Sequence, residues 1–398
     1  MPKSRHSPAH TLTLALTALL VAVLVASPAL AAPWPDPEGP ANQAATFTYD
    51  IFALAPARTP YNAFVCDANG AVFYGAETKN VAPGYVGRVT PTGQITEWAY
   101  GWAPVSMVKD DKSRIWTADL EGTEIARLVP ASNRLTTWDT GYTLLHGISY
   151  RSSTIWSISR HGFVLRFKPG NGELRVFGLP TAAPFKHSLM DDQGRLWIAG
   201  GDLAGAGAAV YMFDSATRKF TRYQLPAGFN PFDIRPAADG AIWFTNFSLK
   251  GKTTSDKAIA RLDPVTAQWT SFGGYPHPNR STSLDWLGNQ IIGVNILGDE
   301  FFLLDPAAPG ETVTLNKTVI QASLHELKTL TPVNRILTPI VSTAPLTNSV
   351  AAGVVAAPYT TFAVPSPSQV YSLFGVKVCD NHVWMSGLLA DQLYHFVR

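Results

Sequence analysis

Short runs of alternating or fully apolar residues follow one another along most of the chain. The clearest unit spans residues 240–272, with apolar runs at 241–245, 258–262 and 268–272. A further alternating run at 232–235 precedes them and is separated by the turn-forming sequence Ala238-Asp239-Gly240. Runs of this length and composition are typical of β-strands. The unit therefore predicts four short antiparallel strands in series.

The same unit recurs along the chain at a nearly fixed period. An aliphatic residue followed by a large apolar residue, most often an aromatic one, marks its second strand, at intervals of 40 to 49 residues with one exception. The pairs begin at Val72, Ile115, Ile155, Leu196, Ile242, Ile291 and Val383. One four-stranded sheet cannot bury both faces alone, so fixed-period repetition predicts a ring of such sheets. We therefore expect an all-β protein, a β-propeller of four-stranded blades.

The exception is the interval of 92 residues between Ile291 and Val383, for which two interpretations stay open. Either one blade carries a long insertion, or residues 318–365 form a degenerate eighth blade. Residues 334–337 resemble the start of a second strand and 359–364 a fourth strand, but the segment lacks the tryptophan and the Asp-Gly turn. The sequence predicts seven or eight blades.

The N-terminal segment, residues 1–31, has a basic start, an apolar run at 12–25 and small residues at Ala29 and Ala31. This pattern predicts a cleaved signal peptide and a secreted or periplasmic protein. The apolar run is shorter than the roughly 20 residues of a spanning helix. We expect no membrane span after cleavage, an extended lead-in at 32–45, and one propeller domain at 46–398.

Two features predict how the ring closes. Residues 46–54 resemble a fourth strand but follow no blade, so we expect this strand to complete the C-terminal blade and remove a sheet edge. Cys66 and Cys379 each end an innermost strand, directly before the aspartate that opens the turn. Because the ring brings the first and last blades together in an exported protein, we expect a disulfide. Two buried free thiols are the alternative.

Composition excludes several function classes. The chain is 46% hydrophobic and 15% charged, so it can bury a large core. Without residues 1–31 it has 29 basic and 29 acidic residues, which argues against nucleic acid as a partner. The sequence contains no serine nucleophile elbow, phosphate loop or cysteine set at zinc spacing. We expect a monomer that acts on, or binds, a small molecule.

The blades resemble those of the virginiamycin B lyase family, also called streptogramin lyases. The likeness rests on IWTADLEGTEIARLVP at 115–130 and IWFTNFSLKGKTTSDKAIARLDP at 242–264, each followed by a Thr/Trp strand. It covers about residues 60–305 and returns at 371–398. The resemblance implies a seven-bladed propeller that opens a cyclic depsipeptide at an ester bond by elimination, with a divalent metal and a histidine base.

The resemblance also indicates where a site would lie. Family members have metal-binding glutamates at second-strand ends, where this chain has Asp119, Ser159, Gly200, Asn246, Asn295 and Ser386. His146 and His187 begin innermost strands of successive blades, where the family places a histidine. Starts of first strands and ends of second strands share one face of a propeller. We therefore predict a site at the channel mouth, with Mg²⁺ or Ca²⁺ held by Asp119, Asn246 and Asn295 and with His146 or His187 as the proton acceptor.

The alternative for these residues is a set of channel-lining polar groups that bond to backbone or water. Arg160, His161, Lys186, His277 and Arg280 are expected in loops on or near the same face, as solvated residues.

Three function classes remain open. The first is a metal-assisted C–O lyase or hydrolase acting on a cyclic ester or depsipeptide-like molecule. The second is a metal-dependent lactonase similar to gluconolactonases, which Asn246 and Asn295 favour. The third is a non-catalytic propeller that binds a ligand or a protein.

Overall fold

The computed structural model describes residues 43–397 except 56–57, 79–80, 102, 120–121, 180–183, 203–204, 248–256, 276–280, 297–299, 345–347, 357, 365–372 and 388–390. The predicted signal peptide and most of the lead-in lie outside these residues. Within the described part of the chain, no helix is long and apolar enough to cross a membrane. Its only helical elements are two 3-10 turns, Ala68–Gly70 and Pro130–Ser132.

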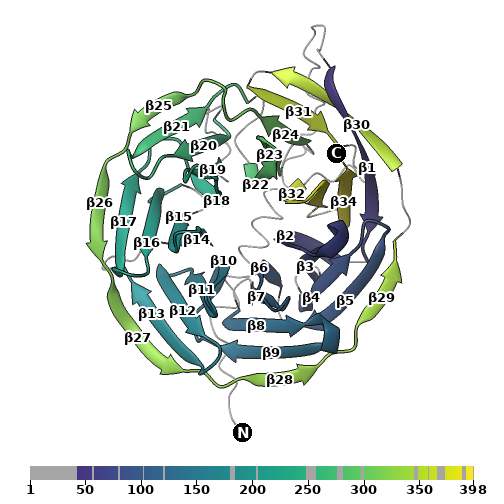
Figure 1. Ribbon diagram of the computed structural model, residues 1–398, viewed down its shortest axis with the longest axis vertical. Coiled ribbons are helices and arrows are strands. Elements are labelled where there is room, and N and C mark those ends of the chain that lie inside the picture. The colour runs from purple at the N-terminus through teal and green to yellow at the C-terminus, as the bar shows by residue number, and fades with distance from the viewer. Residues whose placement is uncertain are drawn as a thin grey trace.

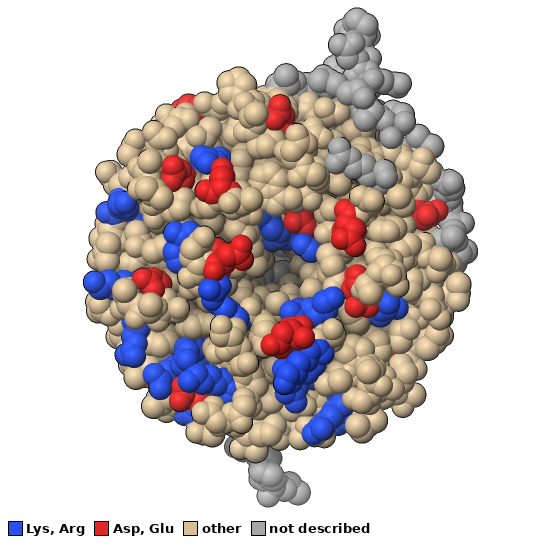
Figure 2. Space-filling view, in the orientation of Figure 1, with Lys and Arg blue, Asp and Glu red and all other residues tan. Residues whose placement is uncertain are grey.

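Seven antiparallel blades form a ring (Figure 1), and the space-filling view shows a hollow centre, the central channel (Figure 2). In each blade the first strand is innermost. Blade 1 contains β2 (Arg58–Cys66), β3 (Val72–Thr78), β4 (Val81–Val89) and β5 (Gln94–Tyr100); blade 2 contains β6 (Pro104–Lys109), β7 (Ile115–Asp119), β8 (Glu124–Val129) and β9 (Arg134–Asp139). Blade 3 contains β10 (Leu144–Arg151), β11 (Thr154–Ser159), β12 (Phe163–Lys168) and β13 (Glu173–Gly178); blade 4 contains β14 (Phe185–Met190), β15 (Arg195–Gly200), β16 (Ala209–Asp214) and β17 (Lys219–Gln224).

The remaining blades follow the same order. Blade 5 contains β18 (Pro231–Pro236), β19 (Ile242–Asn246), β20 (Ile259–Leu262) and β21 (Gln268–Phe272). Blade 6 contains β22 (Ser281–Leu287), β23 (Gln290–Asn295), β24 (Glu300–Leu304) and β31 (Tyr359–Ala363); blade 7 contains β32 (Leu373–Cys379), β33 (His382–Gly387), β34 (Gln392–Val397) and β1 (Gln43–Ala53). The predicted propeller is confirmed, with seven blades.

Residues 311–356 form a belt around the outside of the ring. Its strands are β25 (Glu311–Thr314), β26 (Lys317–Gln321), β27 (Ser323–Thr329), β28 (Val333–Ile336), β29 (Ile340–Thr343) and β30 (Asn348–Ala356). The first five pair in turn with the fourth strands of blades 5, 4, 3, 2 and 1, and β30 pairs with β1 and β31 (Figure 1, green to yellow). The chain thus leaves blade 6 after β24, circles the ring and returns to complete blade 6. The long interval holds this belt and no eighth blade.

Small apolar residues fix the belt at regular intervals. Leu315, Ala322, Leu330 and Ala344 are only 5–8% exposed, and each packs against a hydrophobic cluster between blades. The backbone N–H of each also donates to a carbonyl in the hairpin turn between the third and fourth strands of a blade. The belt thereby covers the outer strand edges, which would otherwise be open to pairing with other chains.

Ring closure follows the prediction. The second half of β1 pairs with β34, with Tyr49 opposite Phe396 and Ile51 opposite Tyr394, and its first half pairs with β30. Cys66 and Cys379 form the expected disulfide, with Cα atoms 5.4 Å apart. The first and last blades are therefore joined both by strand pairing and by a covalent bond.

In blades 2 and 4 the aspartate of the first hairpin turn holds the tryptophan of the same blade. Asp110 Oδ2 accepts hydrogen bonds from Trp116 Nε1 at 2.7 Å and from Arg114 Nε at 2.6 Å. The same arrangement occurs around Asp191 in blade 4. Trp116 is fully buried, so the carboxylate satisfies an indole N–H that would otherwise lack a partner in the core. The repeated Asp and Trp of the sequence thus stabilise the blades.

Candidate functional site

Each innermost strand has a register shift near its start, where it faces the channel. On β6, for example, Pro104 pairs with Asp119 and Ser106 with Ala118, so one residue lies outside the ladder. Comparable shifts occur in β2, β10, β14, β18, β22 and β32. Tyr61, Phe232 and Phe374 lie at such shifts in blades 1, 5 and 7 and belong to one buried apolar cluster. Apolar side chains from these blades are therefore buried together inside the ring at this level.

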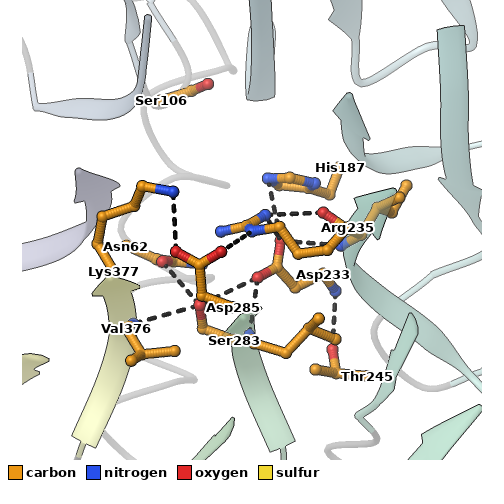
Figure 3. Close-up of polar contacts among 12 residues, drawn as sticks. Asn62, Ser106, His187, Asp233, Arg235, Thr245, Ser283, Asp285, Val376 and Lys377 are labelled. Atoms are coloured by element: carbon orange, nitrogen blue, oxygen red, sulfur yellow. Dashed lines mark hydrogen bonds and ion pairs between the residues drawn. The ribbon is translucent and has the colours of Figure 1, made fainter. Parts of the chain in front are cut away.

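A row of charged side chains crosses four blades (Figure 3). We call it the charged row; it consists of His187 on β14, Asp233 and Arg235 on β18, Asp285 on β22 and Lys377 on β32. Alternate residues of a strand share a face, so Asp233 and Arg235 point to the same side. Figure 2 shows acidic and basic residues around the hollow centre of the ring.

Asp233 is the most enclosed member of the charged row. Its side chain is 0% exposed, and Oδ1 accepts hydrogen bonds from Arg235 Nη1 and from the Ile234 N–H, both at 2.9 Å. Oδ2 accepts from Ser283 Oγ at 3.0 Å and from the Leu284 N–H at 3.1 Å. Burial alone would raise the pKa of this carboxyl, but the cationic partners and the N–H donors outweigh it and lower the pKa. Asp233 is therefore a buried carboxylate.

Arg235, Asp285 and Lys377 continue the charged row with alternating sign. Arg235 Nε lies 3.7 Å from Asp285 Oδ1, and Lys377 Nζ lies 2.8 Å from Asp285 Oδ2. The side chains of Arg235 and Lys377 are 15% and 26% exposed. These two cations are the most exposed members of the charged row.

The charged row also links neighbouring blades through their backbones. Asp233 accepts the Leu284 N–H of blade 6, and Asp285 accepts the Val378 N–H of blade 7 at 2.9 Å. Ser106 accepts the Ile148 N–H of blade 3 in the same way, at 2.8 Å. Such bonds satisfy backbone N–H groups of innermost strands, which form an antiparallel ladder on one side only. Part of this polarity is therefore structural.

The two predicted histidines lie on adjacent innermost strands. His146 and His187 are opposite each other in a parallel bridge between β10 and β14. His187 is 8% exposed, and its Nε2 lies 3.4 Å from Asp233 Oδ1. The side chain of His146 lies outside the described residues. A role for either histidine as proton acceptor stays a prediction.

Asp119, Asn246 and Asn295 lie at the ends of β7, β19 and β23, and all three are at most 1% exposed. Asn246 Oδ1 accepts the Asn230 N–H at 2.8 Å, and Asn295 Nδ2 lies 3.4 Å from Glu300 Oε1. Burial, and then the Glu124 carboxylate, raise the pKa of the Asp119 carboxyl well above its usual range. A raised pKa favours the neutral carboxyl, a poorer metal ligand.

No group of three or more His, Cys, Asp or Glu side chains that could hold a metal ion occurs among the described residues. The predicted Mg²⁺ or Ca²⁺ at Asp119, Asn246 and Asn295 stays a prediction, because two of its three ligands would be asparagine side-chain oxygens, which are not among those four residue types.

Lys186 is not the solvated loop residue that we expected. It lies at the register shift of β14, is 6% exposed, and donates to Asn230 Oδ1. Burial lowers the pKa of its ammonium to about 7, against the opposing effect of the Asp202 carboxylate. His161 is exposed as expected, whereas His277 and Arg280 lie outside the described residues.

Sequence reasoning missed most of the charged row. Asp233, Arg235, Asp285 and Lys377 lie on strands that the pattern itself marks as innermost. A charged residue inside such a strand, as in PFDIRP at 231–236, was the available signal.

The fold and the channel define this protein as a seven-bladed β-propeller. No protein-family model matches the chain, and no curated protein matches it. Among solved structures it is similar to virginiamycin B lyase from Staphylococcus aureus, with a TM-score of 0.60 and 14% identity over 88% of this chain and 99% of that chain. A catalytically inactive variant of that lyase with quinupristin gives a TM-score of 0.63 and 13% identity, over 89% and 100% of the two chains.

The WD40 β-propeller domain of Doa1 is also similar, with a TM-score of 0.51 and 11% identity over 88% of this chain and 97% of that chain. At these identities the likeness shows the fold alone.

Proposed function

We propose that this protein is a binding propeller that takes a small peptide-like or ester-containing molecule into the channel beside Arg235, Asp285 and Lys377. The observation that carries the proposal is the alternation of guanidinium, carboxylate and ammonium along one wall, with contacts of 3.7 and 2.8 Å. Amide and ester groups offer carbonyl acceptors, and amides also offer N–H donors, which such a row matches. Because ion pairs within the charged row already hold these side chains in place, the side chains lose little conformational freedom when a ligand binds.

The members of the charged row differ in how much of each side chain is exposed. Asp233 is fully enclosed and holds Arg235, whereas Arg235 and Lys377 keep exposed surface. The accessible cations would contact ligand carbonyl or carboxylate oxygens, and Asp285 would accept from a ligand N–H. His187 packs against Asp233 with little exposed surface, which supports binding more than proton transfer.

An exported location is part of the proposal. The disulfide between Cys66 and Cys379 supports a secreted or periplasmic protein, because such bonds persist in oxidising compartments.

Calorimetric titration with quinupristin tests the proposal, with product analysis by liquid chromatography and mass spectrometry. We expect saturable binding without conversion, and binding about tenfold weaker in Lys377→Met because one charge-assisted hydrogen bond is lost. Lys328→Met, on belt strand β27, is the matched control and should bind like the wild type. Equal loss in both variants, or no binding of quinupristin or of a panel of small cyclic peptides and esters, contradicts the proposal.

A second candidate is a C–O lyase or hydrolase, which the contact between His187 and Asp233 favours. The ionised Asp233 would hold the imidazole of His187, as carboxylates orient catalytic histidines elsewhere. Conversion of quinupristin by the wild type, lost in His187→Ala with binding retained, would support this candidate over simple binding. Dependence of that conversion on added Mg²⁺ or Ca²⁺ would test the predicted metal, and a gluconolactone substrate would test the lactonase alternative.

A further inference from the structure

Blade 3 departs from the other blades in its pattern of charge. In blades 1, 2, 3 and 5 the third strand carries an arginine at equivalent positions, namely Arg88, Arg127, Arg166 and Arg261. In blades 1 and 5 this arginine pairs with an aspartate of the first hairpin, Arg88 with Asp67 at 2.7 Å and Arg261 with Asp239 at 2.9 Å. The hairpin of blade 3 reads Arg151-Ser152-Ser153-Thr154 and has no carboxylate.

The fourth strand of blade 3 adds a second departure. In blades 1, 2, 4 and 5 a threonine of the fourth strand lies opposite this position of the third strand. These threonines are Thr96, Thr136, Thr221 and Thr270. In blade 3 the residue at this place is Arg175, directly opposite Arg166. Compared with the other blades, the first hairpin of blade 3 lacks an aspartate and carries Arg151, and its fourth strand carries one more cation. Both differences add positive charge to the same part of blade 3.

These residues surround a pocket between blades 3 and 4. The pocket has a volume of about 340 Å³ and is lined by four arginines, Arg151, Arg166, Arg175 and Arg218, together with hydroxyl groups that include Ser152 and Ser215. Among the described residues that line it, none has a carboxylate side chain. Figure 2 shows Lys and Arg gathered over this part of the ring, at the lower left. We call it the arginine pocket.

The nearby carboxylate does not balance the charge of the arginine pocket. Glu173 lies 3.3 Å from Arg166 Nη1 and 2.9 Å from Arg175 Nε, so it is shared by two arginines. Arg151 instead donates through Nη1 to the carbonyl oxygens of Asp191 and Asp192, at 3.3 and 2.7 Å. These backbone acceptors fix the guanidinium but carry no full charge. The arginine pocket therefore retains an excess of positive charge.

We propose that the arginine pocket binds a phosphate or sulfate ester of a small organic molecule. Guanidinium groups present paired N–H donors that match the oxygens of such anions, and serine hydroxyls add further donors. One water molecule occupies roughly 30 Å³ in the liquid, so the pocket exceeds the size of a bare oxyanion and leaves room for an organic group. The pocket is separate from the channel, so this site is independent of the function proposed there.

Calorimetric titration of the full mature chain at constant ionic strength tests the assignment. The probes are glucose 6-phosphate, 4-nitrophenyl sulfate, inorganic phosphate, inorganic sulfate and acetate. We expect saturable binding of at least one ester, tighter than binding of the matching inorganic ion, and no saturation by acetate. The comparison between the two esters decides between phosphate and sulfate.

Arg175→Thr introduces the residue that other blades have, and it should weaken ester binding about tenfold or more. Arg151→Ser is a second variant, placed on an exposed hairpin, and should weaken binding similarly. Arg261→Gln changes the arginine of blade 5 that is equivalent to Arg166, outside the pocket, and should leave ester binding unchanged. Equal weakening by all three variants would mean that the overall charge of the protein, and not this pocket, controls binding, and it would overturn the site. Absence of ester binding would also overturn the site. Inorganic ions that bind as tightly as the esters would overturn the ester assignment.

Discussion

Replacing both Cys66 and Cys379 by alanine should lower the free energy of unfolding by several kcal/mol. The disulfide joins residues 313 positions apart, so it closes a loop of most of the domain in the unfolded chain. The chain-entropy relation gives about 5–6 kcal/mol for a loop of this length. Measured effects of disulfides are commonly about 2–4 kcal/mol, because real unfolded chains retain structure. We therefore expect a loss of about 3–5 kcal/mol.

Urea unfolding followed by tryptophan fluorescence measures this loss, since most blades contain a buried tryptophan. The double variant should unfold at lower urea and with a steeper dependence on denaturant, because its unfolded chain exposes more surface. Wild-type protein treated with reductant should behave like the variant, and reductant should not change the variant itself.

An unfolding midpoint that is the same with and without the disulfide would refute this reasoning. The ring would then be closed by the pairing of β1 with β34 alone, and the cross-link would not restrict the unfolded chain.

Three further predictions concern single side chains. Phe47→Ala removes ring contacts at 5.0 to 6.2 Å with three phenylalanines at the closure and should cost about 3–5 kcal/mol in urea unfolding. Lys186 has a folded-state pKa lowered to about 7, so wild-type stability should rise with pH between about 7 and 10, by an amount on the order of 4 kcal/mol that Lys186→Met lacks. Burial, and then His382, lower the pKa of His395 to about 4, so wild-type stability should fall as pH drops from about 6.5 toward 4, and His395→Gln should lack this part of the fall.

Each of these has a contrary outcome. A Phe47→Ala loss under about 1 kcal/mol would mean that the closure collapses around the gap. Parallel pH profiles of the wild type and Lys186→Met above pH 7, or of the wild type and His395→Gln below pH 6.5, would contradict the assigned titrations.

The blades could be predicted from sequence because local chemistry repeats in each of them. An aspartate-rich turn followed by an aliphatic and aromatic pair encodes both the hairpin and the buried tryptophan, as at Asp110 and Trp116. The first five belt strands lack these signals, because each pairs along one edge only and stays mostly exposed. The belt's own signal was a weaker one, an apolar residue every seven or eight positions, at Leu315, Ala322, Leu330, Leu337 and Ala344.

The charged row was harder to predict, for a physical reason. Whether Asp285 meets Arg235 or Lys377 depends on how blades 5, 6 and 7 approach one another, since the three residues lie on three separate strands. No local pattern encodes that approach. The predicted positions at second-strand ends are buried and bonded within or beside their own blades, as Asn246 is to Asn230.

The belt also sets the order in which the ring can be completed. β24 and β31 are neighbours in blade 6, yet the belt lies between Leu304 and Tyr359 in the chain. Contacts so distant in sequence form slowly, because a long loop must close before any pairing compensates for its entropy. Blade 6 and the junction with β1 are therefore expected to form last. A nascent chain that has not yet supplied β31 leaves one edge of β24 open and still lacks β32, β33 and β34 of blade 7, which follow β31 in the chain, so it is expected to be prone to aggregation until these strands are made.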